Sequence, residues 1–251
     1  MEKLGVIGGM GPEATSYYYD QVVKHTQAAS DQEHLDMVIL SCASMPDRTR
    51  AIQTGDAEEL LRTMRSCTAL LEQAGCAQIA IPCNTSHYFY DQIQASTQVP
   101  IIHMPRETAR YAAAGAVMGE RGFDPAASAG LFASPVRTVG IMATDGTVSS
   151  GVYRDACERA GVTAVAPPAE LQAMVMSIIY DDVKAGHSPN LDAFDQILSW
   201  FLNDAHCDRV ILACTELSVV SQYRALPPEV LDAMDVLVRE SIVRCGAPYR
   251  A

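Results

Sequence analysis

The two cysteines whose positions can support chemistry are Cys83 and Cys214. Each directly follows a short apolar run typical of a buried strand. An Asn-Thr pair follows Cys83, and a Thr-Glu pair follows Cys214. Parallel sheets bind ligands at the carboxyl ends of their strands, so both thiols fall where a site would form. Cys67 and Cys157, by contrast, fall in helix-like segments, as small buried side chains do.

Two opposed thiols can invert a carbon stereocentre. One thiolate removes a proton from one face and one thiol delivers a proton to the other, which a single base cannot do unless the substrate turns over. A thiol suits this exchange because its unperturbed pKa of about 8.5 lies close to neutrality. Amide groups at a helix N-terminus lower a thiol's pKa, and both cysteines are placed for that effect. The pair predicts a reversible racemisation.

The elements that position these thiols alternate between short apolar runs and amphipathic stretches. The predicted strands are Leu4–Ile7, Met37–Ser41, Gln78–Ile81, Pro100–His103, Thr138–Met142, Thr163–Ala166 and Arg209–Ala213. The predicted helices are Glu13–Ala28, Ala57–Ala74, a stretch after Thr147 that ends near Ala160, Leu171–Ala185, Leu191–Ala205 and Pro227–Val243. Such alternation is typical of right-handed βαβ units, so we expect an α/β fold with mostly parallel sheets and helices on both faces.

The second half of the chain repeats the plan of the first: a strand, a glycine loop, a helix and later a strand that ends in a cysteine. Tyr19 and Tyr153 share the offset that separates the two opening strands. We therefore expect two similar lobes, an N-terminal lobe of residues 1–104 plus 224–251 and a C-terminal lobe of residues 105–223. The segment 115–135, rich in Gly, Ala, Ser and Pro, is predicted to be an inserted loop.

The bulk composition excludes several classes of function. The chain has 251 residues and a net charge of −12, which disfavours nucleic acid as a partner. No apolar run approaches the ~18–20 residues that span a bilayer, and no signal peptide is visible, so we expect a cytoplasmic protein with no membrane partner. The eight cysteines should then be free thiols. None shows the Cys-x-x-Cys spacing of a metal site, and no metal is expected.

No organic cofactor is expected either. Lysine occurs only at Lys3, Lys24 and Lys184, so a Schiff base with pyridoxal phosphate would depend on Lys184 alone. The early glycine loop lacks the full Gly-x-Gly-x-x-Gly spacing and a ribose-binding acid, so it does not predict a dinucleotide site.

Five motifs carry a family resemblance. In chain order they are Gly8-Gly9-Met10-Gly11-Pro12-Glu13-Ala14-Thr15, Pro46-Asp47-Arg48-Thr49, Pro82-Cys83-Asn84-Thr85-Ser86-His87, Gly146-Thr147 and Cys214-Thr215-Glu216-Leu217. With them the chain resembles the aspartate/glutamate racemase superfamily, most closely its aspartate racemase branch. The resemblance implies two Rossmann-like lobes related by a pseudo-two-fold axis, with the active site in the cleft between them. It also implies a homodimer and racemisation of a small acidic amino acid without pyridoxal phosphate.

Carried over residue by residue, the resemblance makes Cys83 and Cys214 the catalytic pair, with Cys83 acting on D-aspartate and Cys214 on L-aspartate. The substrate-binding positions that it implies are Met10, Arg48, Asn84, Thr85, Lys184 and Thr215. Arg48 and Lys184 would bind the carboxylates, which suits the dianion of aspartate or, as a weaker possibility, glutamate. Supporting positions are Asp47, His87, Thr144, Thr147 and Glu216.

Simpler interpretations exist for several of these residues. Arg48 can form a surface salt bridge with Asp47 orienting it, Lys184 can complement a helix dipole, and His87 can cap the following helix. Glu216 can orient or deprotonate Cys214, although a nearby carboxylate also raises a thiol's pKa.

Other reaction classes exist among related two-lobe enzymes, which isomerise maleate or decarboxylate arylmalonates. The decarboxylases use one thiol, so two cysteines disfavour that reaction, whereas maleate isomerisation uses two and stays open as the alternative. A non-catalytic binding protein would have no need of both thiols. The inserted segment 115–135, which plain aspartate racemases lack, leaves the identity of the substrate open.

Overall fold

The computed structural model describes residues 1–115 and 135–250, so the predicted inserted loop, apart from its two end residues, lies outside the described residues. The chain divides into two compact units. The first consists of Met1–Met104 together with the chain from Met234 onward, and the second of Pro105–Ala233. The return to the first unit therefore comes later than the predicted boundary at residue 224. The reason is that β7 (Val230–Asp232) pairs with β6 (Arg209–Leu212) in the sheet of the second unit.

The sheet of the first unit is parallel, with the order β2-β1-β3. Its strands are β1 (Leu4–Gly8), β2 (Met37–Ser41) and β3 (Gln78–Ala80), and Leu4 pairs with Met37 on one side and with Gln78 on the other. All residues of β1 are buried, as expected of a central strand. The three strands predicted in this region are confirmed to within a residue or two.

The fourth strand predicted for this unit, at Pro100–His103, is wrong. Ile101 forms only an isolated parallel bridge with Ile79, and no strand develops from it. Pro100 has no N–H to donate, and Met104 already begins the helix α5, so the segment is too short to extend the ladder.

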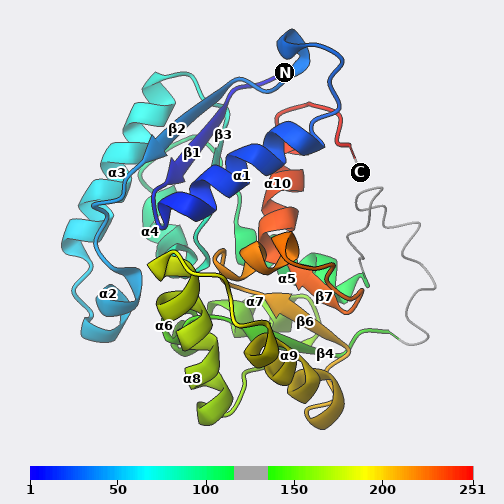
Figure 1. The fold of residues 1–251 in the computed structure, drawn as a ribbon. Helices are drawn as coiled ribbons and strands as arrows, with labels where there is room; N and C mark the ends of the chain where they lie inside the picture. Colours follow the sequence, from blue (N-terminus) through cyan, green and yellow to red (C-terminus); the bar gives the residue numbers. More distant parts are fainter. Residues whose placement is uncertain (116–134, 251) are drawn as a thin grey trace. The chain divides into compact units, whose positions relative to one another are not determined.

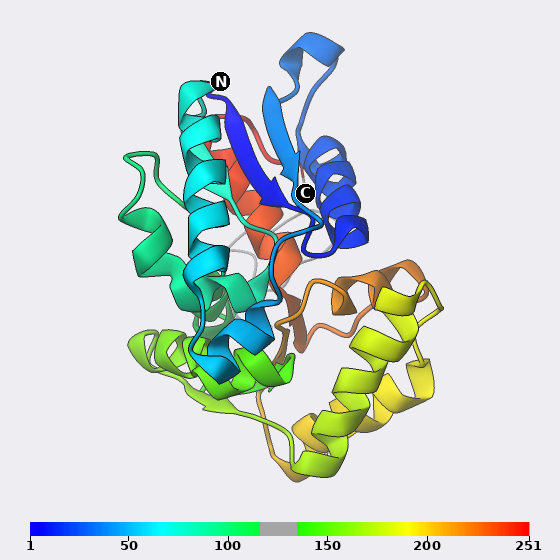
Figure 2. The same ribbon diagram turned by 90° about the vertical axis from the view of Figure 1, so that its left-hand side faces the viewer.

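Five helices surround this sheet: α1 (Pro12–His25), α2 (Arg48–Thr54), α3 (Glu58–Gln73), α4 (Tyr90–Gln94) and α10 (Ala233–Arg244). The two ribbon views place α3 on one side of the sheet and α1 with α10 on the other (Figure 1 and Figure 2). A hydrogen bond from the Tyr18 hydroxyl on α1 to Ser241 on α10, 2.6 Å long, joins the latter two helices. Tyr18 is fully buried, whereas Tyr19 is 48% exposed. Because Tyr153 is buried, the equal sequence spacing of Tyr19 and Tyr153 from their opening strands does not make them structurally equivalent.

The sheet of the second unit has the order β5-β4-β6-β7, and every pair in it is parallel. Its other strands are β4 (Thr138–Met142) and β5 (Thr163–Val165), both close to their predicted bounds. The order β5-β4-β6 repeats the order β2-β1-β3, as expected for two similar lobes. The helix predicted at Pro227–Val243 is wrong in its first part, because pairing with β6 draws Val230–Asp232 into the sheet and α10 begins only at Ala233.

The helices of the second unit are interrupted more often than predicted. They are α5 (Met104–Ala113), α6 (Asp145–Ser150), α7 (Val152–Arg159), α8 (Ala169–Ser177) and α9 (Leu191–Ser199). The predicted helix ending near Ala160 is divided at Gly151, whose φ of 72° lies in the left-handed region. Beyond α8 the chain continues through a π-helical turn and then a 3₁₀ turn, Val183–Ala185, which carries Lys184. Among the described residues, no helix is both long and apolar enough to cross a membrane.

Candidate active site

Cys83 lies three residues beyond β3 and immediately before the 3₁₀ helix η2 (Asn84–Phe89). Its backbone N–H donates to the carbonyl of Ile81 at 2.7 Å, and its own carbonyl accepts from Ser86. These bonds fold the chain sharply at the end of the strand. The thiol is 6% exposed and packs in the apolar cluster that also contains Met10. The predicted placement of this cysteine at a strand end is thus confirmed.

The side chains after Cys83 are also buried. Asn84 and Thr85 are 3% and 8% exposed, and the Ser86 hydroxyl contacts the Met10 sulfur at 3.5 Å. The structure therefore brings the predicted positions of the first unit around Met10 and η2 together. His87 places Nε2 3.2 Å from the carbonyl of Ile81. This contact supports the strand-end turn.

The glycine loop after β1 is held by Thr15. The Thr15 hydroxyl oxygen accepts from the N–H of Gly9 at 2.8 Å and donates to the carbonyl of Gly11 at 3.0 Å. Gly9 has a φ of 89°, and a Cβ there would lie 2.4 Å from the backbone nitrogen of Cys42. Glycine is needed at this position because the loop packs directly on the chain that leaves β2.

The predicted Pro-Asp-Arg-Thr turn is the start of α2, a helix that the sequence analysis missed. Asp47 caps this helix by accepting the N–H of Arg50 at 2.7 Å. The guanidinium of Arg48 is partly buried and donates to the carbonyls of Met45 and Pro46 at 3.3 and 3.0 Å. We expected Asp47 to orient the Arg48 side chain. In the structure two backbone carbonyls orient it instead.

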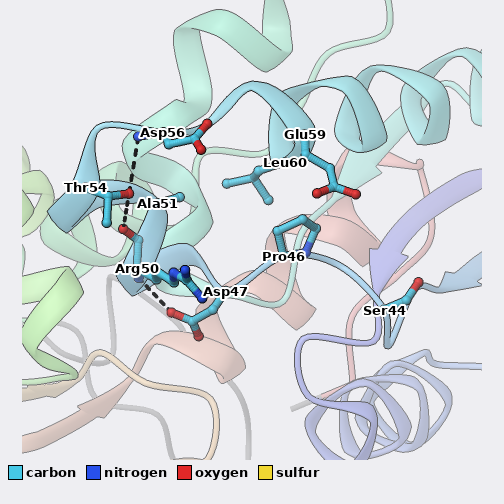
Figure 3. Close-up of a pocket in the computed structure, with 9 residues that line it drawn as sticks. All are labelled: Ser44, Pro46, Asp47, Arg50, Ala51, Thr54, Asp56, Glu59 and Leu60. Atoms are coloured by element: carbon cyan, nitrogen blue, oxygen red, sulfur yellow. Dashed lines mark hydrogen bonds between the residues drawn. The ribbon is translucent and has the colours of Figure 1, made fainter.

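A cavity of about 500 Å³ opens beside this turn (Figure 3). Its lining consists of Ser44, Pro46, Asp47, Arg50, Ala51, Thr54, Asp56, Glu59 and Leu60. No pattern in the sequence predicted it, because it forms where α2 and α3 meet at a corner. Three carboxylates against one guanidinium make it a poor match for an acidic amino acid, and Arg48 does not line it.

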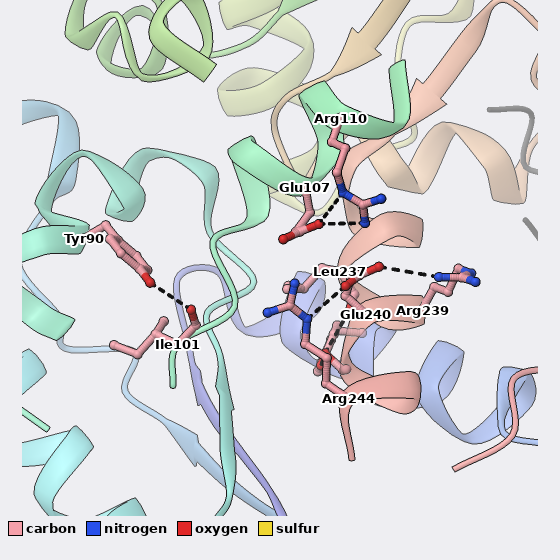
Figure 4. A network of polar contacts seen from close by, with 10 residues as sticks. Tyr90, Ile101, Glu107, Arg110, Leu237, Arg239, Glu240 and Arg244 are labelled. Carbon is pink, nitrogen blue, oxygen red and sulfur yellow. Dashed lines mark hydrogen bonds and ion pairs between the residues drawn. The ribbon is translucent and has the colours of Figure 1, made fainter. Parts of the chain in front are cut away.

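A separate polar network lies on α10 (Figure 4). Glu240, only 6% exposed, accepts from Arg244 Nε at 2.9 Å and from Arg239 Nη1 at 3.4 Å. The carboxylate is thus buried against two guanidinium groups of its own helix, as a buried charge requires. Both of these contacts lie within α10 and involve none of the predicted site residues.

In the second unit, Cys214 follows β6 after a single alanine and is 6% exposed. Its thiol donates to Oε2 of Glu216 at 3.0 Å, and the Thr215 hydroxyl lies 3.4 Å from the same oxygen. The other carboxylate oxygen, Oε1, forms an ion pair with Lys184 Nζ at 3.0 Å. Lys184, which is distant in sequence, therefore joins the neighbouring Glu216 and Cys214 in a continuous Lys184–Glu216–Cys214 series of contacts.

The charges around Cys214 contradict the lowering of its pKa that the sequence predicted. Burial raises the pKa of Cys214 well above its ordinary value, the Glu216 carboxylate raises it further, and Lys184 opposes the rise. The helix that follows is a 3₁₀ helix beginning only at Leu217, and the thiol bonds to a carboxylate instead. Cys214 therefore keeps its proton at neutral pH, with Glu216 in place to accept it.

Two further sets of residues lie in the second unit. Thr144 caps α6, its hydroxyl accepting the N–H of Thr147 at 3.3 Å, so these predicted supporting residues shape the loop that follows β4.

Tyr153 and Asp232 lie near Cys214, and the sequence did not predict either of them as a site residue. Burial raises the pKa of Tyr153, and nearby Asp232 and Cys214 add to the rise. Asp232 ends β7, next to β6, and the incorrect helix prediction hid its place at the strand end.

The family assignment agrees with this arrangement. Residues 7–241 match the family described as Asp/Glu/Hydantoin racemase. The chain belongs to this racemase family. It is 26% identical over 243 residues to the broad specificity amino-acid racemase RacX of Bacillus subtilis (strain 168), with 95% of this chain and 96% of that protein covered.

Solved structures of the racemase family share the fold. Picrophilus torridus aspartate racemase is 25% identical, with a TM-score of 0.75 over 99% of this chain and 96% of that chain. An aspartate racemase homologue from Pyrococcus horikoshii OT3, 23% identical, has a TM-score of 0.73 over 98% and 99%. The predicted α/β fold class and the family resemblance are thereby confirmed.

Proposed function

We propose that the chain is a cofactor-independent racemase that interconverts L- and D-aspartate, with Cys83 and Cys214 as its two acid/base groups. The observation that carries the proposal is the repeated placement of the thiols. Each is buried and comes within a few residues of the end of the corresponding strand, β3 or β6, in two sheets of the same core order. Two other cysteines with equal burial, Cys76 and Cys207, do not precede an Asn-Thr or Thr-Glu pair.

The two thiols exchange roles during one turnover. The Cys214 thiolate takes the α-proton of L-aspartate, and the electron pair of the C–H bond moves into the α-carboxylate as an enolate. The Cys83 thiol then protonates the opposite face, which leaves D-aspartate, a Cys83 thiolate and a Cys214 thiol. The reverse reaction restores the first state. Each protonation state of the pair is therefore the one that acts on one of the two enantiomers.

Because its pKa is raised, Cys214 needs a neighbouring base to become a thiolate, and we propose that Glu216 is this base. A buried thiol that keeps its proton is ready as an acid but not as a base. The 3.0 Å bond from the thiol to Glu216 offers a proton acceptor, and Lys184 on the other carboxylate oxygen stabilises its charged form. We assign Glu216 as the group that deprotonates Cys214 and Lys184 as its counter-charge, which adds to the carboxylate-binding role that the resemblance implies.

Substrate binding is assigned to Arg48, with Lys184, for the carboxylates, and to Asn84, Thr85 and Thr215 for the α-substituents. A guanidinium already positioned by two carbonyls loses little freedom when it pairs with a carboxylate. The relative from Bacillus subtilis is named a broad specificity enzyme. The substrate range therefore has to be measured with neutral amino acids as well as with aspartate and glutamate.

The test is a chiral assay on Cys83→Ser and Cys214→Ser, with Cys76→Ser and Cys207→Ser as matched controls of equal burial. We expect both site variants to lose racemisation of aspartate in both directions and both controls to retain it. Full activity in either site variant refutes the two-thiol proposal. Maleate serves as a parallel substrate, and isomerisation of maleate without turnover of aspartate would favour the alternative reaction.

We further propose a homodimer in the cytoplasm. All eight cysteines are free thiols, as expected in a reducing compartment. Sedimentation equilibrium of the purified chain tests the dimer, and fractionation of the producing cells tests the location.

A further inference from the structure

Two cysteines of the first unit outside the proposed site lie against each other. The sulfur atoms of Cys42 and Cys67 are 3.5 Å apart. Cys42 follows β2 and is partly exposed, whereas Cys67 lies on α3 and is 4% exposed. The two residues come from different elements, separated by 25 positions, so their contact is made by the fold and not by sequence proximity.

We propose that Cys42 and Cys67 are a redox-sensitive pair that a hydroperoxide converts into a disulfide. The sulfur atoms need to approach by only about 1.5 Å to reach the S–S bond length of about 2.05 Å. The partly exposed Cys42 can be reached by a small oxidant, and the buried Cys67 already faces it.

The reaction has two balanced steps. The Cys42 thiolate attacks one hydroperoxide oxygen, the O–O bond breaks, and Cys42 becomes a sulfenic acid. The hydroxide or alkoxide that leaves takes up the proton released when Cys42 ionised, which gives water or an alcohol. The Cys67 sulfur then displaces hydroxide from the Cys42 sulfur, and the Cys67 proton leaves with it as water. Two thiols are oxidised to one disulfide, and one hydroperoxide is reduced. Burial and the neighbouring Cys42 raise the pKa of Cys67 to about 12, so the first oxidation falls on Cys42.

The pair is connected to the turn that carries Arg48. The carbonyl of Cys42 accepts the N–H of Met45 at 3.0 Å, and the carbonyl of Met45 in turn accepts from Arg48 at 3.3 Å. A shift of Cys42 toward α3 therefore moves the anchor of this guanidinium. The consequence is weaker binding of aspartate, a point that rests on the role proposed above for Arg48.

The experiment treats the full chain with a few equivalents of hydrogen peroxide, blocks remaining thiols with iodoacetamide and maps the peptides without reduction. Trypsin alone leaves Cys67, Cys76 and Cys83 on one peptide, because no Lys or Arg lies between Arg65 and Arg106. A second protease that cleaves after Glu72 separates Cys67 from the other two. We expect a Cys42–Cys67 linked peptide that has lost two hydrogen masses, in the wild type and in Cys76→Ser.

Cys67→Ser should instead leave a sulfenic acid on Cys42 that dimedone traps. Linkage of Cys42 to any other cysteine, or over-oxidation of Cys42 in the wild type without a disulfide, overturns the proposal. The KM for aspartate is measured in portions of the same samples taken before iodoacetamide is added, because oxidation of the catalytic thiols lowers the amount of active enzyme but not KM. A disulfide with an unchanged KM would contradict the role of Arg48 and leave the redox pair standing, whereas a raised KM that dithiothreitol reverses supports both.

Discussion

Replacing Glu216 by glutamine should change the chemistry of Cys214 in two measurable ways. The substitution keeps the size of the side chain but removes the negative charge and the ability to accept a proton. Because the carboxylate raises the pKa of Cys214, the pKa should fall in Glu216→Gln. Because the thiol loses its proton acceptor, racemisation should slow.

The size of the effect on the pKa follows from the 3.0 Å distance between the Cys214 sulfur and Oε2 of Glu216. A thiolate and a carboxylate at that distance repel each other by about 5 kcal/mol at an effective dielectric constant of about 20. Lys184, 3.0 Å from the other carboxylate oxygen, offsets part of this repulsion in the wild type and remains in the variant. Loss of a positioned proton acceptor lowers kcat/KM by about 100-fold or more.

The thiolate absorbance of Cys214 is titrated in a Cys83→Ala background, with and without Glu216→Gln, and kcat/KM is measured for each enantiomer in the single variant. The loss of kcat/KM must be equal in the two directions, because the enantiomers have equal free energy. Glu216→Asp, which keeps a carboxylate, should recover part of the activity. A Cys214 pKa that stays unchanged or rises, or full activity in Glu216→Gln, refutes this role for Glu216.

Three further predictions concern charge and packing. Lys184→Met should raise the pKa of Cys214 further, because Lys184 lowers it, and should raise the KM for aspartate; thiolate titration and kinetics test this. Burial raises the pKa of Asp235 to about 6, so the free energy of unfolding falls as pH rises through that value. In urea titrations Asp235→Asn should stabilise the protein above pH 6 by at most about 3 kcal/mol and change little at lower pH. Gly140→Ala should destabilise by about 1–3 kcal/mol, since its Cβ would lie 2.4 Å from Phe201 Cδ1.

The fold could be predicted where local pattern and tertiary pairing agree. The apolar runs at Met37–Ser41 and Thr138–Met142 are strands with the predicted bounds. The runs at Pro100–His103 and Val230–Asp232 are equally apolar, but only the second finds a neighbour to pair with along its length. The helix at Arg48–Thr54 escaped prediction because its sequence is largely polar and only Ala51 is buried.

The positions of the candidate site could be predicted better than its electrostatics. A cysteine that follows a strand and precedes an Asn-Thr or Thr-Glu pair is a local feature, so Cys83 and Cys214 could be picked from eight. The direction of the Cys214 pKa shift depends on burial and on which group meets the sulfur, and neither is visible in the sequence. The same holds for the ion pair of Lys184 with Glu216 and for the contact of Cys42 with Cys67, which only the packed chain creates.

The most direct test of the central claim is the isotope content of the product formed from L-aspartate in deuterated water. Two thiols that exchange their protons with solvent between turnovers predict D-aspartate with one deuterium at the α-carbon, while the remaining L-aspartate stays largely unlabelled early in the reaction. Cys83→Ser should form no D-aspartate. Formation of unlabelled D-aspartate, or of D-aspartate by a variant that lacks either thiol, would contradict racemisation by Cys83 and Cys214.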